Sequence, residues 1–326
     1  MKKKDTLYQL LFTALALYLI FLMLYDPAQA LAYASTGLNL WFTKMVPTLL
    51  PFMILSGIMI RMNLTENFVR LLHPLLYRLF GTSRNGSYTM VMGFLCGFPM
   101  GARIVGELYE QQKLSREEGE LLLHFCNNIG PIYFLSYVVP TLGIERPLGP
   151  FLLMYGIPLL YGFLLLRTAP VLRHLRGTRE LCTAPFSTPV PLSGKQEQSA
   201  DQRPCSLLAA IDASVLSGLI GIARLGGYMV FFNLLNIMFQ PFYHVNSKLL
   251  NVYRCLLEIT SGIDYSGRSI CYAVLILLPF GGFSCIAQTY SMIRHTDLSI
   301  RPYIFHKTIQ TAVTAICYLF LYLHGM

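Results

Sequence analysis

The chain has 326 residues, of which 54% are hydrophobic and 13% are charged, and its net charge is +9. Soluble domains carry roughly 25% charged residues, so this composition excludes a soluble enzyme, a secreted disulfide scaffold and a disordered chain. Basic residues in excess are typical of the cytoplasmic loops of membrane proteins and do not indicate nucleic-acid binding. We therefore expect a polytopic membrane protein.

The first half contains long apolar segments. Residues 7–25 form a run of 19, close to the roughly 20 that cross a bilayer, and we expect a retained helix there rather than a cleaved signal peptide. A second span is expected over 38–60, with Pro47 and Pro51 inside it. Residues 68–80 are too few to cross and alternate apolar with basic positions, which favours a helix along the membrane interface.

Segment 88–109 is apolar, but Gly97-Phe98-Pro99-Met100-Gly101 lies at its centre. Each arm of about 10 residues would measure about 15 Å as a helix, which is too short to cross. This predicts a re-entrant hairpin that enters and leaves on one face. Ser115 and Glu118 have the spacing of a capping box, so a further helix is expected over about 117–142. Asn127-Asn128-Ile129-Gly130-Pro131 predicts a break within it.

The second half follows a plain span over 151–166 and a linker over 168–206 that is rich in Pro, Ser and Thr. Residues 207–240 form one long span or two short ones, and 247–259 are short and amphipathic. Segment 270–293 has Pro279 and Gly281-Gly282 at its centre and is predicted to be a second re-entrant hairpin. The last span is expected over 302–323.

The two halves thus share one order of elements. We expect an N-terminal helix at 1–30, a first repeat at 31–167, the linker at 168–206 and a second repeat at 207–326. If Lys2 to Lys4 lie on the cytoplasmic side, that face holds 15 of the 25 Lys and Arg residues. It consists of the N-terminus and segments 61–86, 109–119 and 167–206. The other face (26–37, 142–149, 243–269 and 294–301) holds 6.

This bias predicts a cytoplasmic N-terminus. The two hairpins would then re-enter from opposite faces, and the repeats would be inverted. Inverted repeats with broken helices are typical of secondary transporters, which bind substrate where the repeats meet.

Several runs resemble a known family. Residues 96–103, Cys-Gly-Phe-Pro-Met-Gly-Ala-Arg, resemble the G-[YF]-P-x-G-A-[KR] signature of the YlbJ-type sporulation integral membrane proteins. Leu114-Ser115 and the run over 125–131 resemble the same family's following helix. Pro47-x-x-x-Pro51-Phe52 and residues 258–262 add to the likeness, which extends from about residue 35 to the end.

The resemblance implies a nucleoside-recognition or Gate-domain fold, similar to concentrative nucleoside transporters, with about six transmembrane helices and two re-entrant hairpins. It also implies a role in spore formation, moving dipicolinic acid across the outer forespore membrane. Because function resides in the site rather than in the fold, the Gate label does not establish a nucleoside substrate.

The candidate substrate site consists of the hairpin tips, the helix break and nearby polar groups. Unwound backbone can contact a ligand, and glycine lets the ligand approach closely. Asn127 and Asn128 could bind a carboxylate or could join neighbouring helices. The predicted substrate-binding residues are Gly97, Phe98, Pro99, Gly101, Arg103, Asn127, Asn128, Glu258, Thr260, Ser261, Gly281, Gly282 and Ser284.

The charged candidates have two interpretations each. Arg103 could hold a carboxylate bidentately, in which case Arg103→Ala abolishes transport, or it could extend to the interface. Glu258 could couple protons, bind substrate or end an interfacial helix. Lys44, Arg224 and Lys307 lie close to the predicted membrane faces, and we expect them to extend to the interface.

We therefore predict a transporter of a small organic anion, dipicolinate above others, and not an enzyme. A nucleoside or other solute carrier is one alternative, and a non-transporting sporulation scaffold or assembly factor is another. No HExxH, GxSxG or paired-carboxylate motif occurs, the eight cysteines form no CxxC pair, and the histidines lack metal-ligand spacing, so no cofactor is expected. The expected partners are the anionic or nucleoside-like substrate and the lipid bilayer. A homo-oligomer is compatible with the sequence, and no nucleic-acid partner is expected.

Overall fold

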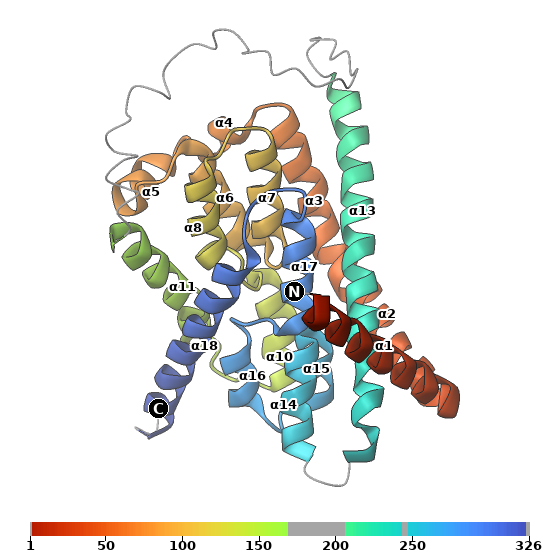
Figure 1. Cartoon of the computed structure of the whole chain (residues 1–326). Coiled ribbons are helices and arrows are strands. Elements are labelled where there is room, and N and C mark those ends of the chain that lie inside the picture. The colour runs from red at the N-terminus through yellow and green to blue at the C-terminus, as the bar shows by residue number, and fades with distance from the viewer. Residues whose placement is uncertain (1, 169–205, 243–246, 324–326) are drawn as a thin grey trace, which may run out of the picture.

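The computed structural model describes residues 2–168, 206–242 and 247–323, and within these ranges every regular element is a helix (Figure 1). Six helices are long and apolar enough to cross a membrane: Tyr8–Tyr25, Pro27–Arg61, Leu148–Thr168, Leu207–Phe239, Cys271–Ile293 and Ile300–Leu321. The predicted all-helical polytopic class is confirmed. Segment 271–293 is one of these six. Segment 117–142, which contains the non-helical residues 127–130, is not.

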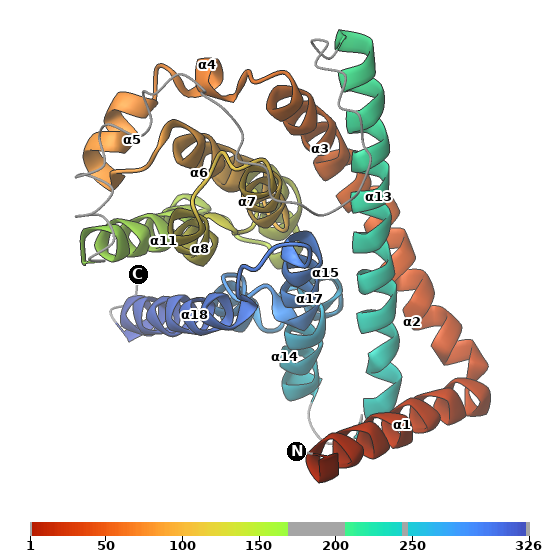
Figure 2. The same ribbon diagram turned by 45° about the horizontal axis from the view of Figure 1, so that its top comes forward.

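The N-terminal part consists of one peripheral helix and one long composite helix. α1 (Lys2–Tyr25) lies at the edge of the bundle against the beginning of α2 (Figure 2). Asp26 caps α2 (Pro27–Leu40) by accepting a hydrogen bond from the Gln29 amide. α2 continues through a π-helical turn, η1 (Trp41–Met45), into α3 (Val46–Arg61). The wide turn comes just before Pro47, whose ring would crowd a regular preceding turn.

The first half then forms a helical hairpin. After the short helices α4 (Thr65–Val69) and α5 (His73–Phe80), α6 (Arg84–Cys96) and α7 (Met100–Glu110) pack against each other. Residues 97–99 form the turn between them, which we call the first tip. A helical hairpin lies over the segment 88–109 for which a re-entrant hairpin is predicted, and its first arm begins four residues earlier, at Arg84.

A broken helix follows. α8 (Arg116–Cys126) begins as predicted, with Ser115 Oγ accepting from the Glu118 amide at 3.2 Å. The Glu118 carboxylate instead accepts from the Ser83 amide at 2.7 Å, which joins the starts of α6 and α8. Residues 127–130, the first break, are non-helical. Beyond them lie α9 (Pro131–Tyr133), the π-helical η2 (Phe134–Val138), α10 (Val139–Leu142) and the long α11 (Leu148–Thr168).

The second half begins with one long helix. α13 (Leu207–Leu234) runs without interruption through Arg224 into the 3-10 helix η3 (Leu235–Phe242), so this region is one span and not two. α14 (Ser247–Leu257) and α15 (Ile259–Ser266) pack against each other as a second hairpin, with Glu258, the second tip, between them. The last elements are α16 (Cys271–Leu277), α17 (Gly282–Ile293) and α18 (Ile300–Leu323).

The prediction that 270–293 forms a hairpin is wrong. α17 continues away from α16 toward the other end of the bundle (Figure 1). Arg268, just before α16, lies against Gly143 at the end of α10. Asp297, just after α17, pairs with Arg116 at the start of α8. Segments 116–142 and 271–293 therefore connect the same two ends of the bundle in opposite directions, and residues 278–281 are a second break within a through-running helix.

The opposite placement predicted for segments 109–119 and 294–301 is also wrong. Tyr109 Oη donates to Asp297 Oδ1 at 2.5 Å, and Arg116 Nη1 lies 3.1 Å from Asp297 Oδ2. Both segments thus lie at one end of the molecule. The hairpin of the second half is instead 247–266, where the sequence predicts only a short amphipathic helix.

Candidate functional site

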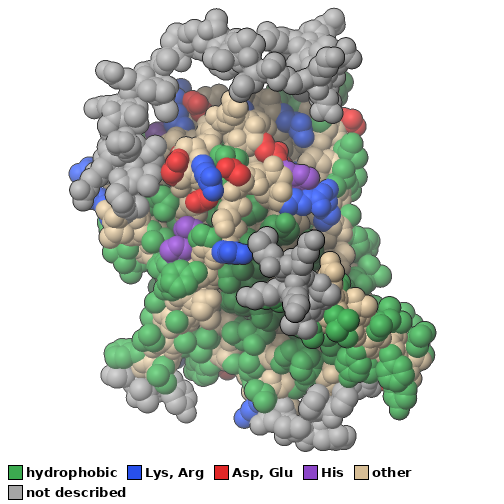
Figure 3. All heavy atoms as spheres, viewed as in Figure 1, with side chains coloured by type: hydrophobic (Ala, Val, Ile, Leu, Met, Phe, Trp, Pro, Cys, Tyr) green, Lys and Arg blue, Asp and Glu red, His purple; other side chains and the backbone are tan. Residues whose placement is uncertain are grey.

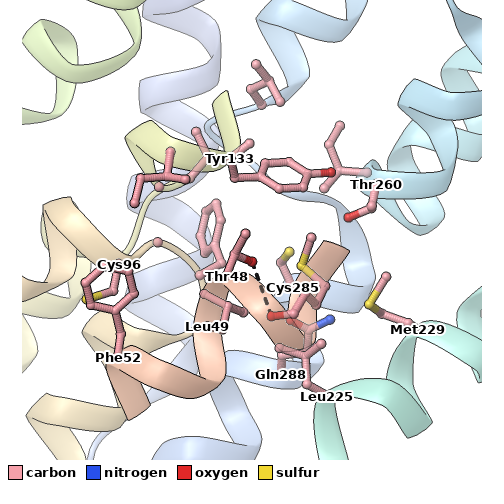
Figure 4. A pocket seen from close by; sticks show the side chains of 18 of the residues that line it. Thr48, Leu49, Phe52, Cys96, Tyr133, Leu225, Met229, Thr260, Cys285 and Gln288 are labelled. Atoms are coloured by element: carbon pink, nitrogen blue, oxygen red, sulfur yellow. Dashed lines mark hydrogen bonds between the residues drawn. The ribbon is translucent and has the colours of Figure 1, made fainter. Parts of the chain in front are cut away.

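A narrow cavity of about 50 Å³, the central cavity, lies where both tips and both breaks meet (Figure 4). Two long helices, α3 and α13, close its remaining sides. The lining residues are Met45, Thr48, Leu49, Phe52, Leu95, Cys96, Gly97, Phe98, Ile129, Gly130, Ile132, Tyr133, Leu225, Met229, Glu258, Ile259, Thr260, Leu278, Cys285 and Gln288. Among the sequence-predicted site residues, Gly97, Phe98, Glu258 and Thr260 line it.

Close backbone contacts bring each tip against a break. A Cβ on Gly97 would lie 2.5 Å from the backbone nitrogen of Gly130, and one on Gly101 would lie 2.6 Å from the Cys126 carbonyl oxygen. In the second half, Gly282 adopts φ +80° and lies against the Cys255 carbonyl in the same way. Gly281 contacts the ring of Phe98 from the first tip. These glycines therefore serve close packing, and Pro99 completes the first tip beside them.

Glu258 lies in the interior and not at an interfacial helix end. Its side chain is 1% exposed, and its two oxygens accept hydrogen bonds from the Thr260 and Ser261 amides at 3.1 and 2.7 Å. The carboxylate therefore caps α15, where the helix dipole favours negative charge. The two amides of its own hairpin thus stabilise its charge.

Asn127 and Asn128 hold the first break to neighbouring helices. Asn127 donates to Thr289 Oγ1 at 2.9 Å and to Tyr303 Oη at 3.2 Å. Asn128 donates to the Phe125 carbonyl at 2.6 Å. Neither amide lines the central cavity, so the helix-joining interpretation describes their contacts in this structure.

The expectation for Lys307 is wrong, because its side chain is fully buried at 0% exposure. Its Nζ donates to Asn128 Oδ1 at 2.7 Å and to Gln310 Oε1 at 3.3 Å. Tyr303, Lys307, Gln310 and Thr314 are all buried and recur at helical spacing. This polar stripe on α18 is the sequence signal that could have located the residue. Lys44 and Arg224, by contrast, are exposed.

Arg103 is buried but lies away from the central cavity. Its Nε pairs with Glu107 at 2.8 Å, and its Nη2 donates to Ser217 on α13 at 2.9 Å. It lines an open cleft of about 560 Å³, the basic cleft, together with Arg61, Arg224 and His295. The acidic Glu107 and Glu110 also border this cleft.

The basic cleft and the central cavity follow the same three helices. On α3, residues within 57–61 line the cleft and residues within 48–52 line the cavity. On α13, residues within 213–224 line the cleft and residues within 225–229 line the cavity. On α17 the corresponding residues are 291–292 and then 285–288. The cleft therefore lies about one helical turn beyond the cavity along the bundle. Charged side chains gather at this end, and the surface below them is mainly hydrophobic (Figure 3).

Two polar residues of the cavity carry no signal in the sequence. The Tyr133 hydroxyl is buried and points toward Thr260 (Figure 4), but it makes no hydrogen bond of good geometry among the described residues. Gln288 donates a hydrogen bond to Ser284 Oγ at 2.9 Å. Ser284, a predicted substrate-binding residue, therefore contacts a lining residue but does not line the cavity itself. Within the described ranges, no three His, Cys, Asp or Glu side chains form a group that could hold a metal ion.

Comparison with known proteins gives one relevant likeness. No family model matches the chain, and no solved structure matches it. The sporulation integral membrane protein YlbJ of Bacillus subtilis (strain 168) is 25% identical over 344 residues, which span 94% of this chain and 81% of YlbJ. The chain is thus similar to YlbJ over nearly its whole length. The resemblance seen in the motifs is thereby confirmed, and the name YlbJ describes a membrane protein without naming an enzymatic activity.

Proposed function

We propose that this YlbJ-type protein is a membrane transporter of a small organic anion, with dipicolinate as its substrate during spore formation. The observation that carries the proposal is the central cavity, which both tips and both breaks line together. Secondary transporters bind their substrates where broken helices of two repeats meet. The name of the relative YlbJ supports the sporulation context.

We infer that the two halves form an inverted repeat with re-entrant hairpins, similar to concentrative nucleoside transporters. Each half contains a long helix, a helical hairpin, a broken helix and a final long helix. The first tip lies against the first break, as Gly97 does against Gly130, and in the second half Gly282, just after the second break, lies against Cys255 of α14, just before the second tip. The corrected position of the second hairpin therefore supports the repeat better than the one predicted from sequence.

The same correction supports a cytoplasmic N-terminus. Placing 294–301 beside 109–119 moves Arg294 and Arg301 to that end, so it would hold 17 of the 25 Lys and Arg residues, with 4 at the opposite end. A larger excess of basic residues on one face favours that face as cytoplasmic. Location in the outer forespore membrane belongs to the same proposal.

The chemistry of the path suits an aromatic anion. The rings of Phe52, Phe98 and Tyr133 line the cavity and would accommodate a flat ring, and the Tyr133 hydroxyl is available to a carboxylate. Basic side chains in the cleft would raise the local concentration of anions. The cavity is smaller than an ordinary small-molecule site of at least about 300 Å³, so substrate binding requires the tips to move apart.

The test is counterflow of labelled dipicolinate into liposomes that contain the purified full chain, with uridine as the comparison. Leu225→Trp should fill the cavity and abolish flux, whereas Leu219→Trp changes an exposed residue of the same helix that lines neither the cavity nor the cleft and should not. Both variants must insert and remain monodisperse. Uridine flux alone would favour a nucleoside carrier, and no flux from folded protein would favour the scaffold function.

A further inference from the structure

Two side-chain amides connect the end of α8 to the Lys307 ammonium. Asn128 donates through Nδ2 to the Phe125 carbonyl at 2.6 Å and accepts from Lys307 Nζ through Oδ1 at 2.7 Å. Gln310 donates through Nε2 to the His124 carbonyl at 2.6 Å and accepts from the same Nζ through Oε1 at 3.3 Å. Because each NH₂ group bonds a carbonyl of the helix end, both amide oxygens face one point.

The charge at this point has no acidic counterpart in the described part of the chain. The four ion pairs found there do not include Lys307. Instead the rings of Phe98 and Tyr303 lie 5.4 and 5.9 Å from Nζ. The C-terminal end of α8 adds the negative end of its dipole. Amide oxygens, aromatic faces and a half-helix C-terminus together stabilise a buried monovalent cation without neutralising it.

We propose that these groups form a monovalent-cation site in which the tethered ammonium of Lys307 is the resident cation. Broken-helix transporters hold a coupling metal ion with unwound carbonyls and half-helix C-termini. Here a compact ammonium occupies such a place. The carrier would therefore need neither Na⁺ nor K⁺ to keep positive charge beside its substrate.

Phe98 connects this cation site to the proposed transport function. Its ring lines the central cavity and also lies against Lys307 Nζ. The Glu258 carboxylate is held by the amides of its own hairpin and forms no ion pair with Lys307, so the ammonium supplies a separate positive charge on the Phe98 side of the cavity. This positive charge would retain an anion there. That part of the inference rests on the proposed function, whereas the cation site itself can be tested without transport.

The first experiment measures thermal unfolding of the purified full chain in choline, sodium, potassium or methylammonium chloride at matched ionic strength. Lys307→Ala should be destabilised and should regain stability saturably in methylammonium, and less in Na⁺ or K⁺, because a ligand of the folded state stabilises by mass action. Wild type and Lys44→Ala should show no preference among the salts. Lys44 is a suitable control because it is exposed and lies over a ring, 5.5 Å from Tyr137.

Two more variants sharpen the result. Asn128→Leu in the Lys307→Ala background should remove the response to methylammonium, since one amide oxygen is lost. Lys307→Met keeps the volume without the charge and replaces Lys307→Ala if that variant does not fold. It should fold without any response to cations and should lose dipicolinate exchange by at least about tenfold, whereas Lys307→Arg retains exchange.

The outcomes separate the two proposals. Equal dipicolinate exchange by wild type in sodium, potassium and choline media supports the inference, and a requirement for Na⁺ or K⁺ overturns it. Lys307→Ala without any cation-specific stabilisation, or Lys307→Met with normal exchange, also overturns it. If wild type exchanges no dipicolinate but Lys307→Ala still responds to methylammonium, the cation site stands and the anion-transport function fails.

Discussion

The Tyr109 hydroxyl donates a hydrogen bond to the Asp297 carboxylate over 2.5 Å, across 188 positions of sequence. Tyr109 ends the first hairpin, and Asp297 lies in the turn after the second broken helix. Arg116, the first residue of α8, pairs with the same carboxylate at 3.1 Å. This contact joins the two halves at one end of the bundle and fixes the direction of the second broken helix relative to the first.

This contact makes stability depend on acid pH. The hydrogen bond from Tyr109 and the charge of Arg116 lower the pKa of Asp297 below its ordinary value. Asp297 therefore binds a proton more readily in the unfolded chain than in the folded one. Its contribution to folding stability is fully present above the ordinary Asp pKa and is lost as the pH falls through the lowered pKa of the folded state.

Asp297→Asn should reduce the unfolding temperature by at most about 2 °C at neutral pH, because the group is exposed. It should also flatten the loss of stability on acidification, which thermal unfolding across an acid pH series measures. Glu145→Gln, at an exposed position elsewhere, is the control. An unchanged acid profile in Asp297→Asn would contradict the assignment.

The first tip depends on a glycine that no other residue can replace without strain. Gly97 adopts φ +92°, and a Cβ there would overlap the backbone of Gly130. Gly97→Ala should cost at least about 2 kcal/mol, because both the backbone conformation and the overlap are unfavourable. Thermal unfolding and membrane yield measure the effect. Gly227→Ala, where nothing lies within 4 Å of the new Cβ, should be neutral or slightly stabilising.

The success and the failure of hairpin prediction have a common physical cause. A glycine or proline at the centre of an apolar run interrupts a helix but does not say whether the chain turns back. The arms around Gly97 turn back as predicted. Segment 270–293 is just as interrupted, yet it runs through the bundle, and only the contacts of Arg268 and Asp297 with the first half reveal this.

The second hairpin was missed because its tip is charged. A Glu at the centre of 247–266 resembles the end of an interfacial helix, and only the two amides that Glu258 itself caps make its burial possible. Lys307 was misplaced for a similar reason, since its distance from the end of α18 resembles that of an interfacial residue. The buried stripe through Gln310 and Thr314 distinguishes the two cases, and it can be recognised in the sequence.

Tyr133 offers a test of the cavity that leaves the fold unchanged. Its buried hydroxyl lies beside Thr260 without a hydrogen bond of good geometry, so Tyr133→Phe should lower stability only slightly. If the hydroxyl donates to a substrate carboxylate, dipicolinate affinity should fall by about 10- to 100-fold, since a hydrogen bond to a charged group contributes about 1.5–3 kcal/mol. Competition against labelled dipicolinate measures this.

The control for this variant is Tyr137→Phe. The Tyr137 hydroxyl donates to the Thr260 carbonyl at 3.3 Å and is not part of the cavity lining. Its removal should lower stability and leave affinity unchanged. Equal affinity in Tyr133→Phe and wild type would place the substrate elsewhere.

Arg103 is expected to act in the basic cleft and not as the clamp that holds the substrate. Arg103→Ala should leave the partly buried Glu107 unpaired and cost about 1–3 kcal/mol of stability. Because Arg61, Arg224 and His295 remain in the cleft, dipicolinate uptake should fall only about 3- to 10-fold, and the loss should shrink at high salt.

The double variant Arg103→Ala/Glu107→Ala separates stability from attraction of the anion. It should recover most of the lost stability, because no unpaired charge remains, and uptake should recover as well if removing the Glu107 charge offsets the missing guanidinium. Thermal unfolding and initial uptake rates at low and high salt measure the two effects. A complete and salt-independent loss of uptake in both variants, with normal folding, would instead make Arg103 the group that binds the carboxylate directly.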